Sequence, residues 1–115
     1  MSEKFFDSLC RALDYLIATE KRAVMVVAEV LTLEEEGKTL YQVFIEFDFG
    51  GSKFGEARKV LADLWFDDFS AVKLLLDHLM ANYPLKDTKD FVVAPTITRR
   101  DYRFKLRDFP AIFED

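Results

Sequence analysis

The stretch that most constrains the fold is residues 23–49, which has the composition of one long β-hairpin. Its two arms, AVMVVAEVLTL and TLYQVFIEFDF, are dense in the β-branched and aromatic residues that suit strands, and a charged segment, EEEGK, joins them. Gly37 near the end of that segment suits a left-handed residue in a loop longer than two residues. The sequence therefore predicts an antiparallel sheet organised around this hairpin.

The register of the hairpin decides which side chains share a face. Pairing Leu33 with Thr39 would join two apolar sets on the face that helices cover: Met25, Val27 and Leu31 with Tyr41, Val43, Ile45 and Phe47. The second face would then carry Val24, Val26, Ala28, Val30 and Thr32 opposite Leu40, Gln42, Phe44, Glu46 and Asp48. This second face is too apolar to be fully solvated, so we expect a strand, a helix or a second copy of the chain to cover it.

Three helices are expected around the hairpin. Apolar residues recur at helical spacing in Glu3–Glu20, in Glu56–Phe66 and in Phe69–Asn82. The segment Val60–Phe66 could instead be a buried strand, but its apolar run does not alternate, which favours the helix. Asp67 or Asp68 would cap the third helix, and Pro84 would end it.

The C-terminal part predicts two strands. Lys86–Asp90 has the composition of a polar linker, and Phe91–Thr98 that of a strand in which Pro95 marks an edge, a bulge or a break. Residues 99–109 alternate, with Tyr102, Phe104 and Leu106 against Arg103, Lys105 and Arg107. The fold class is thus α+β, in the order α-β-β-α-α-β-β, with an antiparallel sheet and helices on one face. All of residues 1–115 form a single domain, and residues 110–115 are a short tail whose order the sequence leaves open.

The sequence contains no clear catalytic or metal-binding pattern. The chain has one cysteine, Cys10, and one histidine, His78, so nucleophilic triads and Cys-based zinc sites lack partners. Both residues are more typical of core or helix-edge positions, and Asp67 with Asp68 is more typical of a cap than of a metal site. The loop GGSKFG at Gly50–Gly55, which contains Lys53, favours a connector over a phosphate cradle. We therefore expect no catalytic residues, no metal and no cofactor.

Acidic and basic residues are unevenly distributed along the chain. The formal net charge is −5, yet residues 99–107 hold five basic residues and one Asp. The basic residues are Arg99, Arg100, Arg103, Lys105 and Arg107. Pairing with acids such as Glu46, Asp48 or Glu29, or plain solvation, is the favoured interpretation, and an acidic protein or a single-stranded nucleic acid is the alternative. Because the aromatics alternate with the cations, bases and phosphates could not be gripped on one face.

These observations favour a small acidic, non-enzymatic protein–protein interaction module of the adaptor, chaperone or inhibitor kind. The chain lacks an apolar run long enough for a membrane span and lacks a signal-peptide pattern, so we expect a cytoplasmic protein that binds no membrane. The expected partner is a protein, with self-association as a homodimer through the second sheet face, at Val24, Val26, Val30, Leu40 and Phe44. Nucleic-acid binding by the basic residues of 99–107 is the alternative function.

Overall fold

The computed structural model describes residues 3–52 and 55–108, and for residues 51, 52 and 55–58 the backbone alone. Two helices and five strands follow in the order α-β-β-β-α-β-β. They are α1 (Glu3–Thr19), β1 (Met25–Glu35), β2 (Lys38–Ser52), β3 (Gly55–Phe66), α2 (Phe69–Asn82), β4 (Leu85–Ala94) and β5 (Ile97–Lys105). The α+β class and the long hairpin are confirmed, and the predicted element order is wrong at one element.

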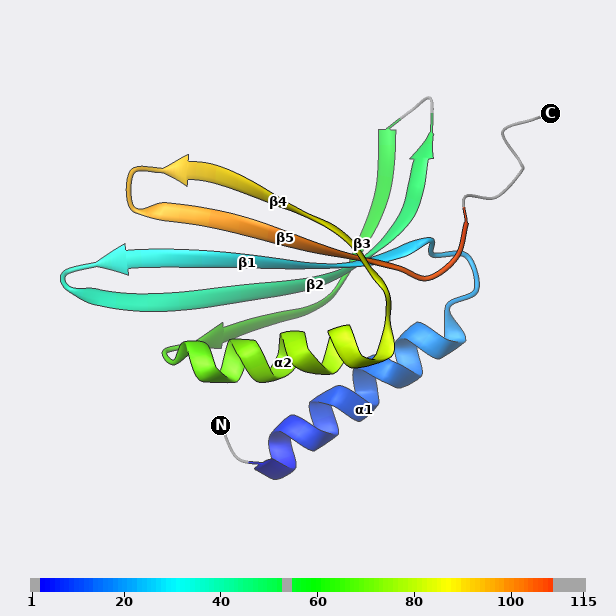
Figure 1. The fold of residues 1–115 in the computed structure, drawn as a ribbon, viewed down its shortest axis with the longest axis horizontal. Helices are drawn as coiled ribbons and strands as arrows, with labels where there is room; N and C mark the ends of the chain where they lie inside the picture. Colours follow the sequence, from blue (N-terminus) through cyan, green and yellow to red (C-terminus); the bar gives the residue numbers. More distant parts are fainter. Residues whose placement is uncertain (1–2, 53–54, 109–115) are drawn as a thin grey trace.

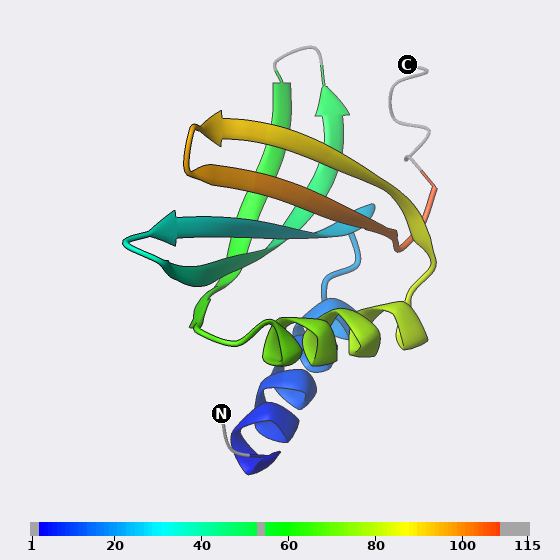
Figure 2. The ribbon, with the colours of Figure 1, turned by 60° about the vertical axis from the view of Figure 1, so that its left-hand side comes forward.

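All five strands form one antiparallel sheet in the order β3-β2-β1-β5-β4, so β3 and β4 are its two edges. Both helices lie on the same side of this sheet (Figure 1). Neither helix covers the opposite side of the sheet (Figure 2). We call these two sides the helix face and the open face.

The segment Gly55–Phe66, predicted as a helix, is strand β3. It pairs with β2 and has a register shift at Leu61, the residue between the pairs Ile45–Ala62 and Glu46–Val60. A bulge inserts one extra residue and interrupts the period of two, which is why the run does not alternate as a regular strand would. Pairing with the long β2 outweighs the helical spacing of the apolar residues.

The hairpin register differs by one residue from the predicted one. Glu35 pairs with Lys38, and Leu33 pairs with Leu40 rather than with Thr39. The helix face therefore carries Val26, Ala28, Val30 and Thr32 opposite Phe47, Ile45, Val43 and Tyr41. A one-residue slip exchanges the faces of one strand relative to the other, so Met25, Val27 and Leu31 lie on the open face instead.

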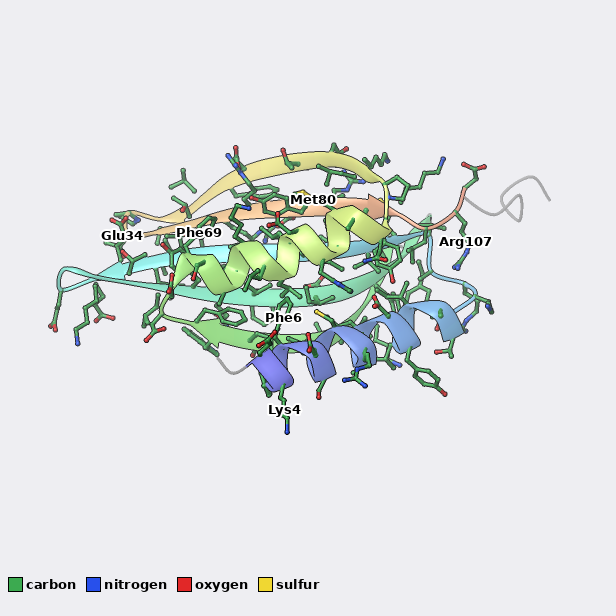
Figure 3. All side chains as sticks on the ribbon, turned by 60° about the horizontal axis from the view of Figure 1, so that its bottom comes forward. Lys4, Phe6, Glu34, Phe69, Met80 and Arg107 are labelled. Atoms are coloured by element: carbon green, nitrogen blue, oxygen red, sulfur yellow. The ribbon has the colours of Figure 1, made fainter. Side chains whose placement is uncertain are left out.

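The other two predicted helices, Glu3–Glu20 and Phe69–Asn82, are confirmed as α1 and α2. In α2, Asp68 accepts a hydrogen bond from the Ser70 N–H at 2.9 Å, and the helix ends before Pro84, as expected. The core forms where α1 and α2 meet the helix face, and its buried members include Leu13, Ile17, Val72, Leu75, Leu79 and Phe104. Phe6 extends from α1 into the space between the two helices and the sheet (Figure 3). Over the residues described, neither helix is long and apolar enough to cross a membrane.

The C-terminal strands form a second hairpin. The predicted linker Lys86–Asp90 belongs to β4, and Pro95 lies in the turn between β4 and β5, where it ends the strand. The predicted alternation is confirmed, because Tyr102 and Phe104 lie opposite Ala28 and Val26 on the helix face. The predicted tail 110–115 and Lys53 of the glycine-rich loop lie outside the described residues. That loop joins β2 to β3, because the segment after it, predicted as a helix, is a strand.

Candidate protein-binding groove

A broad groove of about 1280 Å³ opens where the first turns of both helices meet the end of β3. We call it the N-terminal groove. Its apolar walls come from four separate segments, and its lining residues include Phe5, Phe6, Leu40, Trp65, Phe66 and Leu74. It is a surface groove rather than a closed cavity, because its largest side chains remain accessible to solvent.

Four large apolar side chains are exposed along this groove. Phe5 and Leu74 are 55% exposed, Trp65 is 56% exposed and Leu40 is 40% exposed. Single apolar residues on a surface are ordinary, but a contiguous group in a concavity is typical of a binding surface. Trp65 is the only tryptophan of the chain, and tryptophan is among the residues that most often carry binding energy in interfaces.

The rim of the groove is acidic. Glu3 and Asp7 come from α1, and Asp67 and Asp68 come from the loop before α2. The pKa of Asp68 lies below its ordinary value because the Ser70 backbone N–H donates to its carboxylate, so this side chain stays ionised at neutral pH. Within the part of the chain that the structure describes, no Lys, Arg or His lines the groove.

Part of this acidity is structural. Carboxylates are favoured at helix N-termini, where each helix presents a partial positive charge of roughly half an elementary charge. Two helices begin at this groove, so their dipoles offset part of the negative charge that the four acids carry.

The predicted apolar patch does not exist as one surface. Because of the corrected register, Val26 and Val30 are buried in the core beneath the helices, and Val24, directly before β1, is buried as well. By register Leu40 and Phe44 lie on the open face, as does Trp65, which pairs with Gln42. Since Leu40 and Trp65 line the N-terminal groove together with residues of both helices, the groove extends around the β3 edge of the sheet. The motive for self-association through the second sheet face is thereby removed, and of the five residues only Leu40 lines the N-terminal groove.

The open face is covered by its own long side chains. The Arg99 guanidinium lies 2.9 Å from the Asp101 carboxylate and 4.2 Å from the centre of the Phe91 ring. Arg103 lies 3.5 Å from Asp87 and donates toward the Met25 sulfur at 3.7 Å. Arginine stems can bury apolar surface while their charged ends stay paired or wet, and Met25 and Val27 on this face are buried although neither helix covers them.

Each of the five predicted basic residues has a partner within the chain. Besides Arg99 and Arg103, Arg100 pairs with Asp90 at 2.6 Å and Lys105 with Asp108 at 2.6 Å. Arg107 donates to the backbone carbonyls of Ala23 and Glu20. Internal charge pairing is thus present, with Asp87, Asp90, Asp101 and Asp108 as the acids, whereas the sequence had pointed to Glu46, Asp48 and Glu29. Binding of nucleic acid by these residues stays a prediction.

A group of acids lies near the centre of the open face. Glu29 pairs in register with Asp101 on β5 and lies near Glu46 on β2. Burial, followed by the charges of Glu46 and Asp101, raises the pKa of Glu29 to about 7, although Arg99 opposes the shift. Glu29 lines neither the N-terminal groove nor the smaller groove beside β4.

The remaining candidates have structural surroundings. His78 Nε2 lies 3.0 Å from the Asp14 carboxylate, which also accepts from the Tyr83 hydroxyl at 3.1 Å, so this histidine joins the two helices. Cys10 is buried, and burial, followed by the charge of Asp14, raises the pKa of its thiol. Among the described residues, no group of three or more His, Cys, Asp or Glu could hold a metal ion.

Sequence reasoning missed the N-terminal groove because no continuous segment encodes it. Its residues come from the start of α1, from β2, from the end of β3 and from α2, and the misassigned β3 placed Trp65 in a helix stripe. The only signal along the chain was an apolar pair, Trp65 and Phe66, directly before Asp67 and Asp68. No family model, curated protein or solved structure matches the chain.

Proposed function

We propose that the protein is a non-enzymatic protein-binding module that uses the N-terminal groove to hold a segment of another protein. The segment would carry large apolar side chains flanked by Lys or Arg. The observation that carries the proposal is the group of four exposed apolar side chains, Phe5, Leu40, Trp65 and Leu74, inside an acidic rim.

The chemistry of the groove favours this partner over others. Burial of Trp65 and Leu74 by an apolar side chain would supply the main attraction, at roughly 25 cal/mol per Å² of apolar surface. The rim would select cationic flanks, raise the association rate and disfavour acidic segments. A nucleic acid or an anionic membrane surface would be repelled by the same rim.

The proposal covers the roles of adaptor, chaperone and inhibitor, because each of them requires a stable domain that holds a partner segment without chemistry. Selection of peptides from a random library tests the proposal directly. Peptides enriched on the wild-type chain should combine Leu, Ile, Phe or Trp with Lys or Arg, and the Leu74→Asp variant should lose them. Val60→Asp is the matched control, since Val60 on β3 is 55% exposed, as Leu74 is, and does not line the groove.

Two outcomes would count against the proposal. One is enrichment of acidic or purely polar peptides. The other is enrichment of the same peptides on wild type and Leu74→Asp, because the groove would then not be the binding surface.

A further inference from the structure

The free edge of β4 is a second unusual surface. β4 is the outermost strand on the side of the sheet opposite β3 and is exposed along most of its length (Figure 2). Val92 is 81% exposed, and Leu85, Phe91 and Val93 are also exposed. An open edge with apolar side chains is a template for pairing with another strand.

Backbone groups of β4 point out from this edge at alternate residues. The Lys105 N–H donates to the Pro84 carbonyl at 2.8 Å, which fixes the odd-numbered residues of β5 as the ones that bond toward β4. Their pairing partners Asp87, Lys89 and Phe91 therefore direct their backbone groups toward β5. Thr88, Asp90 and Val92 consequently direct N–H and C=O groups to the free edge.

The charged side chains of residues 86–90, KDTKD, are complementary to themselves in one antiparallel register. When two copies run antiparallel with Thr88 opposite Thr88, Lys86 meets Asp90 and Asp87 meets Lys89. Asp87, Thr88 and Lys89 lie in the regular part of β4, and Lys86 lies at the register shift between Leu85 and Asp87. Leu85, which pairs with Phe104, is on the helix face and Phe91, which pairs with Arg99, is on the open face, so these two residues do not contribute to the match.

We propose that a second copy of the chain pairs with the β4 edge in this register, so that two sheets join into one across a two-fold axis at Thr88. A two-fold arrangement is self-complementary by symmetry, so each contact occurs twice. Thr88 has outward backbone groups, so the two threonines would form a hydrogen-bonded pair of the antiparallel kind.

The charges needed for this pairing are available. Lys86 and Lys89 make no ion pair within residues 3–52 and 55–108. The acids are bound on one side only, since the Asp90 side chain pairs with Arg100 yet is 65% exposed. Each acid would then lie between an arginine of its own β5 and a lysine of the second copy.

A smaller groove of about 400 Å³ lies beside the β4 edge, where the second copy would bind. It runs between the start of α2 and the helix face of β4 and β5, and its lining includes Thr32, Phe69, Val92 and Tyr102. Phe69 and Met80 lie on the flank of α2 that is turned toward β5 and β4 (Figure 3). A second copy seated on the edge would cover this apolar flank, and the N-terminal groove at the opposite side would stay open in both copies.

Cysteine cross-linking tests the register. Residues facing each other across a hydrogen-bonded antiparallel pair have Cα atoms about 5.5 Å apart, within the range of a disulfide. In a Cys10→Ala background, Thr88→Cys should therefore give an oxidised dimer. Val92→Cys should not, because the two Val92 residues would be eight positions out of register, about 26 Å apart at 3.3 Å per residue.

Light scattering on the full chain completes the test. The wild type should show twice the mass of one chain, and the double variant Lys86→Asp/Lys89→Asp should show the mass of one. The double variant Lys4→Asp/Lys21→Asp, with the same change in net charge away from β4, should stay a dimer. A monomeric wild type, a disulfide at Val92 in place of Thr88, or a dimer that survives the β4 charge reversal would each overturn the proposal.

Discussion

Glu36 and Gly37 form the two-residue turn between β1 and β2, and both have a left-handed backbone, with φ of 51° and 75°. Two successive residues with positive φ define the tight turn whose twist matches that of a hairpin. The turn closes the pair Glu35–Lys38 and so fixes every pair further along the two strands. The left-handed backbone of Glu36 is thus part of the turn that sets the hairpin register, and the register decides which side chains of β1 and β2 face the core.

Replacing Glu36 by Asn should stabilise the protein. A left-handed conformation costs most residues roughly 1–2 kcal/mol, and Asn tolerates it better. We expect Glu36→Asn to raise the free energy of unfolding by about 0.5–1 kcal/mol, measured by urea denaturation. Glu35→Asn, one residue earlier in the strand, is the control and should give no gain. A loss of stability in Glu36→Asn would contradict the turn geometry.

The stability of the fold should fall as the pH rises toward neutrality, because of Glu29. The pKa of Glu29 is raised from its ordinary 4.5 to about 7, so the folded state holds this proton more tightly than the unfolded chain. The contribution is complete below about pH 4.5 and is lost as the pH rises through 7. We expect this carboxyl to account for about 1–2 kcal/mol between pH 5 and pH 8 after solvent screening.

The variant Glu29→Gln isolates this effect from the other titrating groups. Its free energy of unfolding should exceed that of the wild type at pH 8 and should approach it at pH 5. An equal difference between the two proteins at both pH values would show that Glu29 does not carry a raised pKa.

Asp14 should be the acid that ties α1 to α2. Its carboxylate accepts from His78 and Tyr83, two residues of the other helix and its cap. Removal in Asp14→Ala should cost about 1–2 kcal/mol, because two partly buried donors lose their acceptor. Asp7→Ala, an exposed acid on the same helix, should change stability by no more than about 0.5 kcal/mol. Equal effects of the two substitutions would argue against this link.

Substitutions in the groove should change the free energy of unfolding much less than substitutions in the core. Leu79 is fully buried in the core, and Leu79→Ala should cost about 2–5 kcal/mol. Leu74 lies on the same helix but is exposed in the N-terminal groove, so Leu74→Asp should cost no more than about 0.5 kcal/mol. Thermal unfolding measures both. A large loss in Leu74→Asp would mean that this residue supports the fold and is unsuitable as a binding probe.

Elements with local signals could be predicted from the sequence. The cap Asp68 and the stop at Pro84 fixed α2 at both ends, and the alternation around Tyr102 and Phe104 placed their side chains on the helix face. Strand β3 could not be predicted, because its bulge at Leu61 breaks the alternation and its apolar residues happen to follow a helical spacing. Its state depends on pairing with β2, which no local pattern encodes.

The hairpin shows a similar limit on a smaller scale. Its composition identified the element, whereas its register depended on the backbone of Glu36, a residue that rarely adopts φ above zero. This error of one residue joined Val26 and Val30 to Phe44 on a face that they do not share. The N-terminal groove needed the correct place of β3 and both helices at once, so it could be recognised only in the assembled fold.

The emission of Trp65 offers the most direct measurement of groove binding. Trp65 is the only tryptophan, so its fluorescence reports on the groove alone. A synthetic amphipathic peptide of Leu and Lys should shift this emission to shorter wavelength and saturate, and a Leu and Glu peptide of the same pattern should not. The shift should disappear in Leu74→Asp and persist in Val60→Asp. An unshifted emission, or an equal shift with the acidic peptide, would contradict the proposal that this groove holds an apolar segment with basic flanks.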